Sequence, residues 1–159
     1  MRSVLISIQP QWCELIANGT KTIEVRKSAP KEVPFKAYIY MTATKERCRF
    51  WEYITAYQNN KGDILKGSQK VIGEFICDKV VKYEEHIEEG GLYYTLENDF
   101  NEACQLDNWE LHDYGNGKPI YAWHISDLKI YDKPKRLVDF TAPCKRALMR
   151  PPQSWQYVE

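Results

Sequence analysis

Apolar residues along the chain recur with two spacings, one typical of strands and one typical of helices. The apolar run Val4–Ile8 predicts a buried first strand, and Pro10 suits the first turn of a following helix. The next apolar side chains recur at i, i+3 and i+4, as on the core-facing stripe of a helix: Trp12, Leu15 and Ile16. Asn18-Gly19 then puts a glycine where helices commonly end. The chain therefore opens with a predicted strand and one early helix.

Residues 19–26, Gly-Thr-Lys-Thr-Ile-Glu-Val-Arg, concentrate charge within a strand pattern directly behind that helix. β-branched side chains favour a strand, and side chains alternate between its two faces. We therefore expect Glu24 and Arg26 on a solvated face, with Ile23 and Val25 pointing into the core. Lys21 precedes the strict alternation and is expected at the mouth of the strand.

Three further stretches carry strand patterns: Lys36–Met41, Lys70–Val81 and Ile120–Tyr131. The second is the longest and is mostly apolar on both faces, which predicts a central strand that holds Glu74 between two isoleucines. Apolar spacing predicts a helix over 45–57 and a short helix over 99–106, while 59–67 reads as a polar loop. The sequence Tyr114-Gly115-Asn116-Gly117 predicts a turn.

This order of elements, with turns instead of long helical crossovers, predicts an α+β fold rich in strands. A small β-barrel or half-barrel is the expected architecture because it limits exposed sheet edges. The barrel would carry the early N-terminal helix and one or two further short helices. A length of 159 residues suits one domain over 1–159, with a basic C-terminal extension over 132–159 packed on it.

Composition narrows the class of protein. No stretch approaches the roughly 20 apolar residues of a membrane helix, and no signal peptide is recognisable, so we expect a cytoplasmic protein that does not bind membranes. The odd number of well-separated cysteines, without a CxxC pair, argues against a zinc site and indicates reduced thiols: Cys13, Cys48, Cys77, Cys104 and Cys144. A catalytic cysteine remains an open alternative.

The formal net charge of zero conceals an uneven distribution. Residues 1–70 hold 12 Lys and Arg against 6 Asp and Glu, and residues 115–159 hold 8 against 4. Residues 71–114 hold 2 against 12. If the two ends fold together, a basic surface lies opposite an acidic one, which indicates a phosphate-bearing partner or a mixed soluble surface.

The opening from Leu5-Ile6-Ser7-Ile8-Gln9-Pro10-Gln11-Trp12 through residues 19–26 resembles the ASCH domain of the PUA-like superfamily. The family signature, approximately G-x-K-x-x-E-x-R behind a short helix, is matched by Lys21, Glu24 and Arg26, and Gly73-Glu74 fits the later strand. The resemblance covers about residues 1–131. It implies a small β-barrel with a cleft lined by the signature lysine and acid, and binding of RNA or modified nucleosides.

The resemblance also implies two activities. Some ASCH proteins resemble amidohydrolases that deacetylate N4-acetylcytidine, and others have been assigned ribonuclease activity. The amidohydrolase branch uses a lysine, a threonine three positions later and a glutamate in the later strand; Lys21 and Glu74 match, and Glu24 takes the place of the threonine. Glu74 would act as a general base, Lys21 would stabilise an oxyanion, and Glu24 would orient Lys21 or be a second acid–base group.

A binding module without catalysis is the favoured function. Aromatic side chains would stack on bases, among them Trp12, Tyr40 and Trp51, and Arg26 and Lys27 would contact phosphates. Two unclustered acids, Glu24 and Glu74, do not suffice for a metal site, so we expect no metal and no cofactor. His124 is expected to be a hydrogen-bonded core residue. The structural alternative is a salt-bridge network of Lys21, Glu24, Arg26 and Glu74 that closes one end of the barrel. The sequence does not indicate the oligomeric state.

Overall fold

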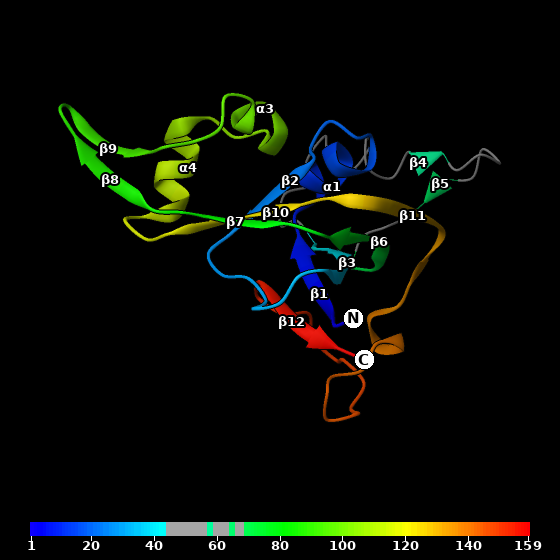
Figure 1. Cartoon of the computed structure of the whole chain (residues 1–159). Coiled ribbons are helices and arrows are strands. Elements are labelled where there is room, and N and C mark those ends of the chain that lie inside the picture. Colours follow the sequence, from blue (N-terminus) through cyan, green and yellow to red (C-terminus); the bar gives the residue numbers. More distant parts are fainter. Residues whose placement is uncertain (44–56, 59–63, 66–68) are drawn as a thin grey trace.

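A computed structural model describes residues 1–43, 57–58, 64–65 and 69–159 (Figure 1). Its helices and strands are, in chain order, β1 (Ser3–Ile8), α1 (Pro10–Ala17), β2 (Ile23–Arg26), β3 (Phe35–Met41), β4 (Tyr57–Gln58), β5 (Ile64–Leu65), β6 (Val71–Cys77), β7 (Val80–Tyr83), β8 (Glu85–Glu88), β9 (Gly91–Tyr94), α3 (Phe100–Cys104), α4 (Asn108–Gly115), β10 (Ile120–His124), β11 (Ser126–Lys135), the 3-10 helix η1 (Leu137–Asp139) and β12 (Trp155–Val158). The predicted helix over 45–57 and loop over 59–67 fall largely outside the described residues, as do Cys48 and Trp51.

The larger sheet has five strands in the order β11-β6-β3-β1-β12. β1 and β3 run parallel, and the other pairs in this sheet are antiparallel. Helix α1 packs on one face, where Cys13 and Ile16 join the core formed by the sheet. The opposite face carries Leu5 and Tyr40, which pack against Phe140 and other residues from the C-terminal part of the chain. The predicted first strand, early helix and central position of β6 are therefore confirmed.

The smaller sheet has three strands in the order β2-β10-β7 and is joined to the larger one by two bent strands. The stretches predicted as single strands over 70–81 and 120–131 are each divided in two. β6 gives way to β7 after Cys77, and β10 gives way to β11 at Ile125. The amide of His124 donates to the carbonyl of Lys79 at 2.9 Å, so the two bends lie side by side. Such bends allow a strand to leave one sheet and enter another.

The fold is α+β, as predicted, with an N-terminal helix and two further short helices among the described residues. The expectation was a small β-barrel or half-barrel, and no closed barrel is found among the described residues. Within the described ranges no sheet closes on itself: β11 and β12 are the edges of the larger sheet, and β2 and β7 are the edges of the smaller one. The two bent strands divide the pairing into two open sheets.

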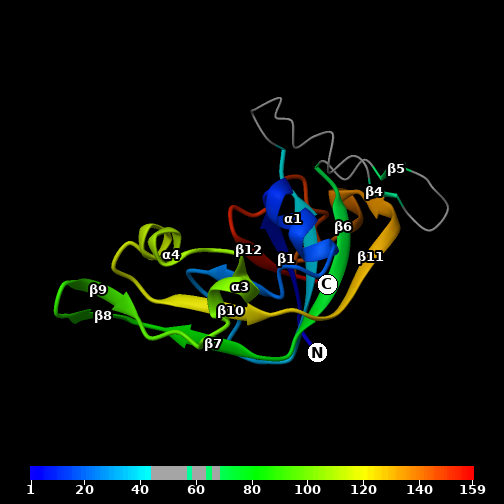
Figure 2. The ribbon, with the colours of Figure 1, turned by 90° about the horizontal axis from the view of Figure 1, so that it is seen from above.

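The acidic middle of the chain forms an arm at one end of the molecule. The hairpin β8–β9 and helix α4 lie beside the smaller sheet, on the side away from β11 (Figure 2). Leu111 of α4 and Phe100 of α3 pack with Val25 of β2 in a separate core cluster. Helix α4 was not predicted; only the turn at its end was, where Asn116 adopts a left-handed conformation with φ of 48°.

The two ends of the chain fold together, because β12 pairs with β1 (Figure 1). No helix in the described part of the chain combines the length and apolar character needed to span a membrane.

Candidate functional site

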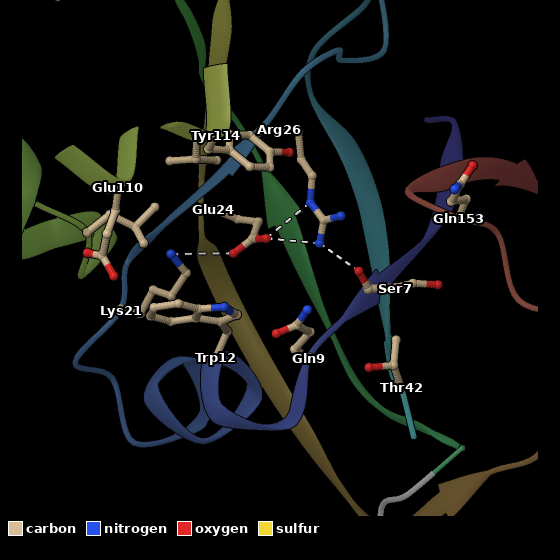
Figure 3. Close-up of a pocket in the computed structure, with 12 residues that line it drawn as sticks. Ser7, Gln9, Trp12, Lys21, Glu24, Arg26, Thr42, Glu110, Tyr114 and Gln153 are labelled. Carbon is tan, nitrogen blue, oxygen red and sulfur yellow. Dashed lines mark hydrogen bonds and ion pairs between the residues drawn. The ribbon is translucent and has the colours of Figure 1, made fainter. Parts of the chain in front are cut away.

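A cavity of about 340 Å³ opens between β2, α1, α4 and the C-terminal segment (Figure 3). It brings together residues from distant parts of the chain, with charged, aromatic and neutral polar side chains around one hollow. The described residues that line it are Ser7, Gln9, Trp12, Lys21, Glu24, Val25, Arg26, Thr42, Leu106, Glu110, Tyr114 and Gln153.

Lys21 is buried beside this cavity, with 3% of its surface exposed. Its Nζ donates to the carbonyl oxygen of Cys104 at 2.5 Å, at the C-terminus of α3, and lies 3.5 Å from Glu24 Oε2. The same Nζ lies 5.2 Å from the ring centroid of Trp12, within range of a cation–π interaction. The ammonium is therefore held by a carbonyl, a carboxylate and an aromatic ring at the wall of the cavity.

Arg26 holds the same carboxylate from the other side (Figure 3). Its Nη2 lies 2.9 Å and its Nε 3.1 Å from Glu24 Oε1, and Nη2 also donates to the carbonyl of Ser7 at 2.7 Å. The prediction of a solvated face for Glu24 was wrong, since only 5% of its surface is exposed. A carboxylate is tolerated at such depth because two cations compensate its charge. Val25 lies in the core as predicted, whereas Ile23 is half-buried.

Trp12 packs against the edge of the core and also lines the cavity. The buried stripe of α1 consists of Pro10, Cys13 and Ile16, while Trp12 is half-buried. The stripe is thus rotated relative to the predicted one, and the indole ring is placed against Lys21 at the cavity wall.

Helix α4 contributes two residues that the sequence analysis did not single out, Glu110 and Tyr114. The signal that could have found them is the capping box at the start of the helix: Asp107 accepts from the Glu110 amide at 2.8 Å, and Glu110 accepts from the Asp107 amide at 2.9 Å. Leu111 is fully buried and fixes the helix on the smaller sheet. Burial raises the pKa of Tyr114, so its hydroxyl stays neutral at physiological pH.

Glu74 lies elsewhere, on the larger sheet. Its Oε1 is 3.1 Å from Lys36 Nζ on β3, and its Oε2 accepts a hydrogen bond from the Tyr131 hydroxyl on β11. Desolvation raises the pKa of Glu74, but the hydrogen bonds from Tyr131 and Lys36 outweigh it and leave the pKa below its ordinary value. The structure therefore brings Lys21 and Glu24 together and does not bring Glu74 to their cavity.

Two other predicted ligand-binding residues also lie away from the cavity lining. Lys27 is exposed, and its Nζ lies 5.0 Å from the ring centroid of Tyr114. Tyr40 is 5% exposed and packs in the core near Phe140. His124 was expected in the core, but it is exposed at the bend between β10 and β11, where its Nδ1 lies 2.6 Å from Asp78 Oδ1.

The buried cysteines do not have the character of nucleophiles. Burial raises the pKa of the Cys13 and Cys104 thiols and raises that of Cys77 to about 12, which disfavours the reactive thiolate. Cys144 is exposed, and no cysteine is among the described residues that line the cavity. Across the described residues, no group of three or more His, Cys, Asp and Glu side chains has an arrangement suited to a metal ion.

The chain belongs to the ASCH domain family, whose family model matches residues 6–134. Among solved structures it is similar to the ASCH protein of Zymomonas mobilis, with 21% identity and a TM-score of 0.63 over 99% of this chain and 88% of that one. A tyrosine-to-phenylalanine variant of the Zymomonas protein matches with 20% identity and a TM-score of 0.62 over 100% of this chain and 91% of that one. At this identity the similarity establishes the fold alone. No curated protein matches the chain.

Proposed function

We propose that the cavity beside Lys21 and Glu24 binds one nucleoside unit, either a free modified nucleoside or a base of RNA. The observation that carries this proposal is the convergence of Lys21, Glu24, Trp12 and Tyr114 on a single cavity. Its volume, about 340 Å³, lies at the small end of the roughly 300–1,000 Å³ range of ligand pockets, which suits one ring system and its substituent.

The charges around the cavity favour a ligand without net charge. Two cations, Lys21 and Arg26, face two acidic side chains, Glu24 and Glu110. Arg26 is already engaged by Glu24 and the Ser7 carbonyl, so little of its charge is available to a phosphate. A heterocyclic base offers donors and acceptors without charge and fits such a balanced wall better than a phosphate does.

Aromatic side chains provide the second part of the argument. Trp12 enters the cavity wall from α1 and Tyr114 from α4, so rings are present on two separate elements (Figure 3). Stacking of a base on an aromatic side chain contributes roughly 1–3 kcal/mol. Lys21 and Glu24 would then hydrogen-bond to the polar edge of the base, while the rings of Trp12 and Tyr114 stack on its faces.

Calorimetric titration tests this function with cytidine, N4-acetylcytidine and a single-stranded RNA decamer. We expect saturable binding of at least one nucleoside with little dependence on salt, since few counterions are released when a neutral ligand binds. Binding of the decamer alone, with affinity that falls steeply with salt, would instead indicate contacts to the phosphate backbone. Absence of binding by all three would contradict the proposal.

A second candidate function, hydrolysis of an N-acylated nucleoside, is favoured by the adjacency of Lys21 and Glu24 at the cavity. Water would add to the acyl carbon, a carboxylate would take its proton and pass it to the leaving nitrogen, and the C–N bond would break to give a free amine and a carboxylic acid. Lys21 would stabilise the oxyanion, and Glu24 or Glu110 would serve as the base in place of Glu74.

Chromatography after incubation with N4-acetylcytidine separates these functions. Conversion to cytidine that is lost in Lys21→Met would establish hydrolase activity. Binding without conversion would indicate a protein that binds the nucleoside without catalysis. Shortening of the RNA decamer in parallel samples would instead indicate the ribonuclease activity assigned to some ASCH proteins.

A further inference from the structure

One residue of the cavity wall opposite α4, Gln153, lies outside the family match, which ends at residue 134. Residues 151–154 run past the cavity just before β12 pairs with β1. The Ser7 hydroxyl donates to the carbonyl of Pro152 at 2.6 Å, and the Ser7 amide donates to the carbonyl of Ser154 at 2.9 Å. The same residue of β1 therefore holds the chain on both sides of Gln153.

These contacts leave the side chain of Gln153 at the cavity while its neighbours are fixed (Figure 3). Trp155 fixes the same segment further along the chain. Its indole Nε1 donates to Ser28 Oγ at 3.0 Å, and its ring packs against Trp123 with centroids 5.8 Å apart. Ser7 also links this segment to the buried ion cluster, since its carbonyl accepts from Arg26. A side chain carried on a backbone already ordered without ligand costs less to position on binding.

This side of the cavity differs in chemistry from the side with Lys21. Its one charged side chain, Arg26, is already paired with Glu24. The other groups are neutral hydroxyls and amides, from Ser7, Gln9, Thr42 and Gln153. Such groups offer both donors and acceptors, as sugar hydroxyls do. A phosphate would need unoccupied cations, and a flat base would need an aromatic face, so a ribose is the part of a nucleoside that fits here.

We infer that Gln153 is a specificity-determining residue that contacts the ribose 2′-hydroxyl, so that the ligand is a ribonucleoside and not a deoxyribonucleoside. The inference rests on the proposed function and deepens it. The 2′-hydroxyl both donates and accepts, as the glutamine amide does, and it is the group by which proteins distinguish RNA from DNA. A site that bonds this hydroxyl disfavours the analogue that lacks it, because the hydrogen bond to the Gln153 amide is then lost.

Titration with matched nucleoside pairs tests the inference: cytidine against 2′-deoxycytidine, and adenosine against 2′-deoxyadenosine. We expect the unaltered protein to bind the better ribonucleoside about 3- to 10-fold more tightly than its deoxy counterpart, the size of effect that one neutral hydrogen bond produces. Gln153→Met keeps the side-chain length and removes the amide. It should weaken binding of the ribonucleoside alone and so bring the ratio of ribonucleoside to deoxyribonucleoside affinity close to one. Gln156→Met is the matched control, since Gln156 lies on β12 and does not line the cavity, and it should leave the ratio unchanged.

A ratio near one in the unaltered protein, or an unchanged ratio in Gln153→Met, would overturn the inference while the nucleoside site itself stands. Loss of the ratio in Gln156→Met as well would also overturn it, since the selectivity would then follow from the packing of β12. Absence of binding by every nucleoside would instead defeat the proposed function, and the role of Gln153 with it. Because Gln153 is exposed, Gln153→Met should unfold at the temperature of the parent protein.

Discussion

Two lysine–glutamate pairs occupy different environments in this protein. Lys21 and Glu24 are almost wholly buried, and both line the cavity. The side chains of Lys36 and Glu74 are 29% and 20% exposed, and they pair across neighbouring strands of the larger sheet. Glu74 has one cation and one tyrosine as partners, whereas Glu24 is held between two cations.

The difference distinguishes the proposed binding site from a structural ion pair. Burial of charge seldom improves stability over apolar packing, and an enclosed cluster of three charges beside a cavity is therefore the basis of the binding role that we propose. A half-exposed pair that bridges strands needs no such role, because the cross-strand contact itself accounts for it. The family resemblance alone assigns Glu74 to the same site as Lys21, and only the structure separates the two.

The largest effect is expected from Glu24→Gln. Loss of the carboxylate charge leaves Lys21 and Arg26 beside each other without compensation, and breaking a buried ion cluster in this way costs about 3–5 kcal/mol. Urea unfolding should report this loss in the free energy of unfolding. Glu74→Gln is the matched control and should lose far less; equal losses would mean that the two carboxylates are equivalent.

Lys21→Met should have its main effect on the ligand. Methionine keeps the packing against Trp12, and Glu24 keeps Arg26 as its partner, so we expect a stability loss of about 1–3 kcal/mol from the lost charged hydrogen bond. Nucleoside affinity should fall at least about tenfold, which corresponds to about 1.4 kcal/mol. Calorimetric titration measures this fall, and Lys36→Met provides the comparison at the other pair, where affinity should not change.

Glu74→Gln should alter the response of the fold to acid. Because its pKa in the folded protein lies below the ordinary value of 4.5, the ionised carboxylate contributes stability at neutral pH. That contribution disappears as the pH falls from about 4.5 through the lower, folded-state pKa. The variant should therefore lose roughly 1 kcal/mol at pH 7 and progressively less than that in acid. A stability difference that stays constant from pH 7 to pH 3 would show that the charge of Glu74 is irrelevant.

The smallest effect is expected from Lys27→Ala. Lys27 is exposed and contacts the ring of Tyr114 outside the cavity lining, and an exposed cation–π contact is worth about 0.5–1 kcal/mol. Nucleoside affinity should change by less than about threefold, which is well below the tenfold loss expected for Lys21→Met. A loss as large as that of Lys21→Met would place Lys27 in the site and extend the binding surface beyond the cavity.

Local patterns predicted the parts of the site that are close in sequence. The spacing from Lys21 to Arg26 places three charges on one short strand and directly before it, and in the structure the three charges meet. The same pattern gave the wrong exposure for Glu24, since alternation identifies two faces but does not reveal that α1 and α4 enclose one of them.

Contacts between distant segments account for what the sequence did not reveal. Glu110 and Tyr114 depend on α4 packing over the smaller sheet, and Gln153 depends on a hydrogen bond between residues 145 positions apart. Glu74 was assigned to the site by the family resemblance, and its strand could not correct this, because both faces are largely apolar and do not tell which face meets which neighbour. The division of two long strands into two sheets, which replaced the expected barrel, likewise follows from a bend and not from alternation.

The most direct test of the account is a titration of the isotope-labelled protein with cytidine and N4-acetylcytidine, followed by NMR amide shifts. We predict that the shifts concentrate in residues 7–9, 21–26 and 106–114, which surround the cavity, and that residues 36, 74 and 131 do not respond. Shifts centred on Glu74 and Lys36, with the residues around Lys21 and Glu24 unchanged, would contradict the assignment of the binding site.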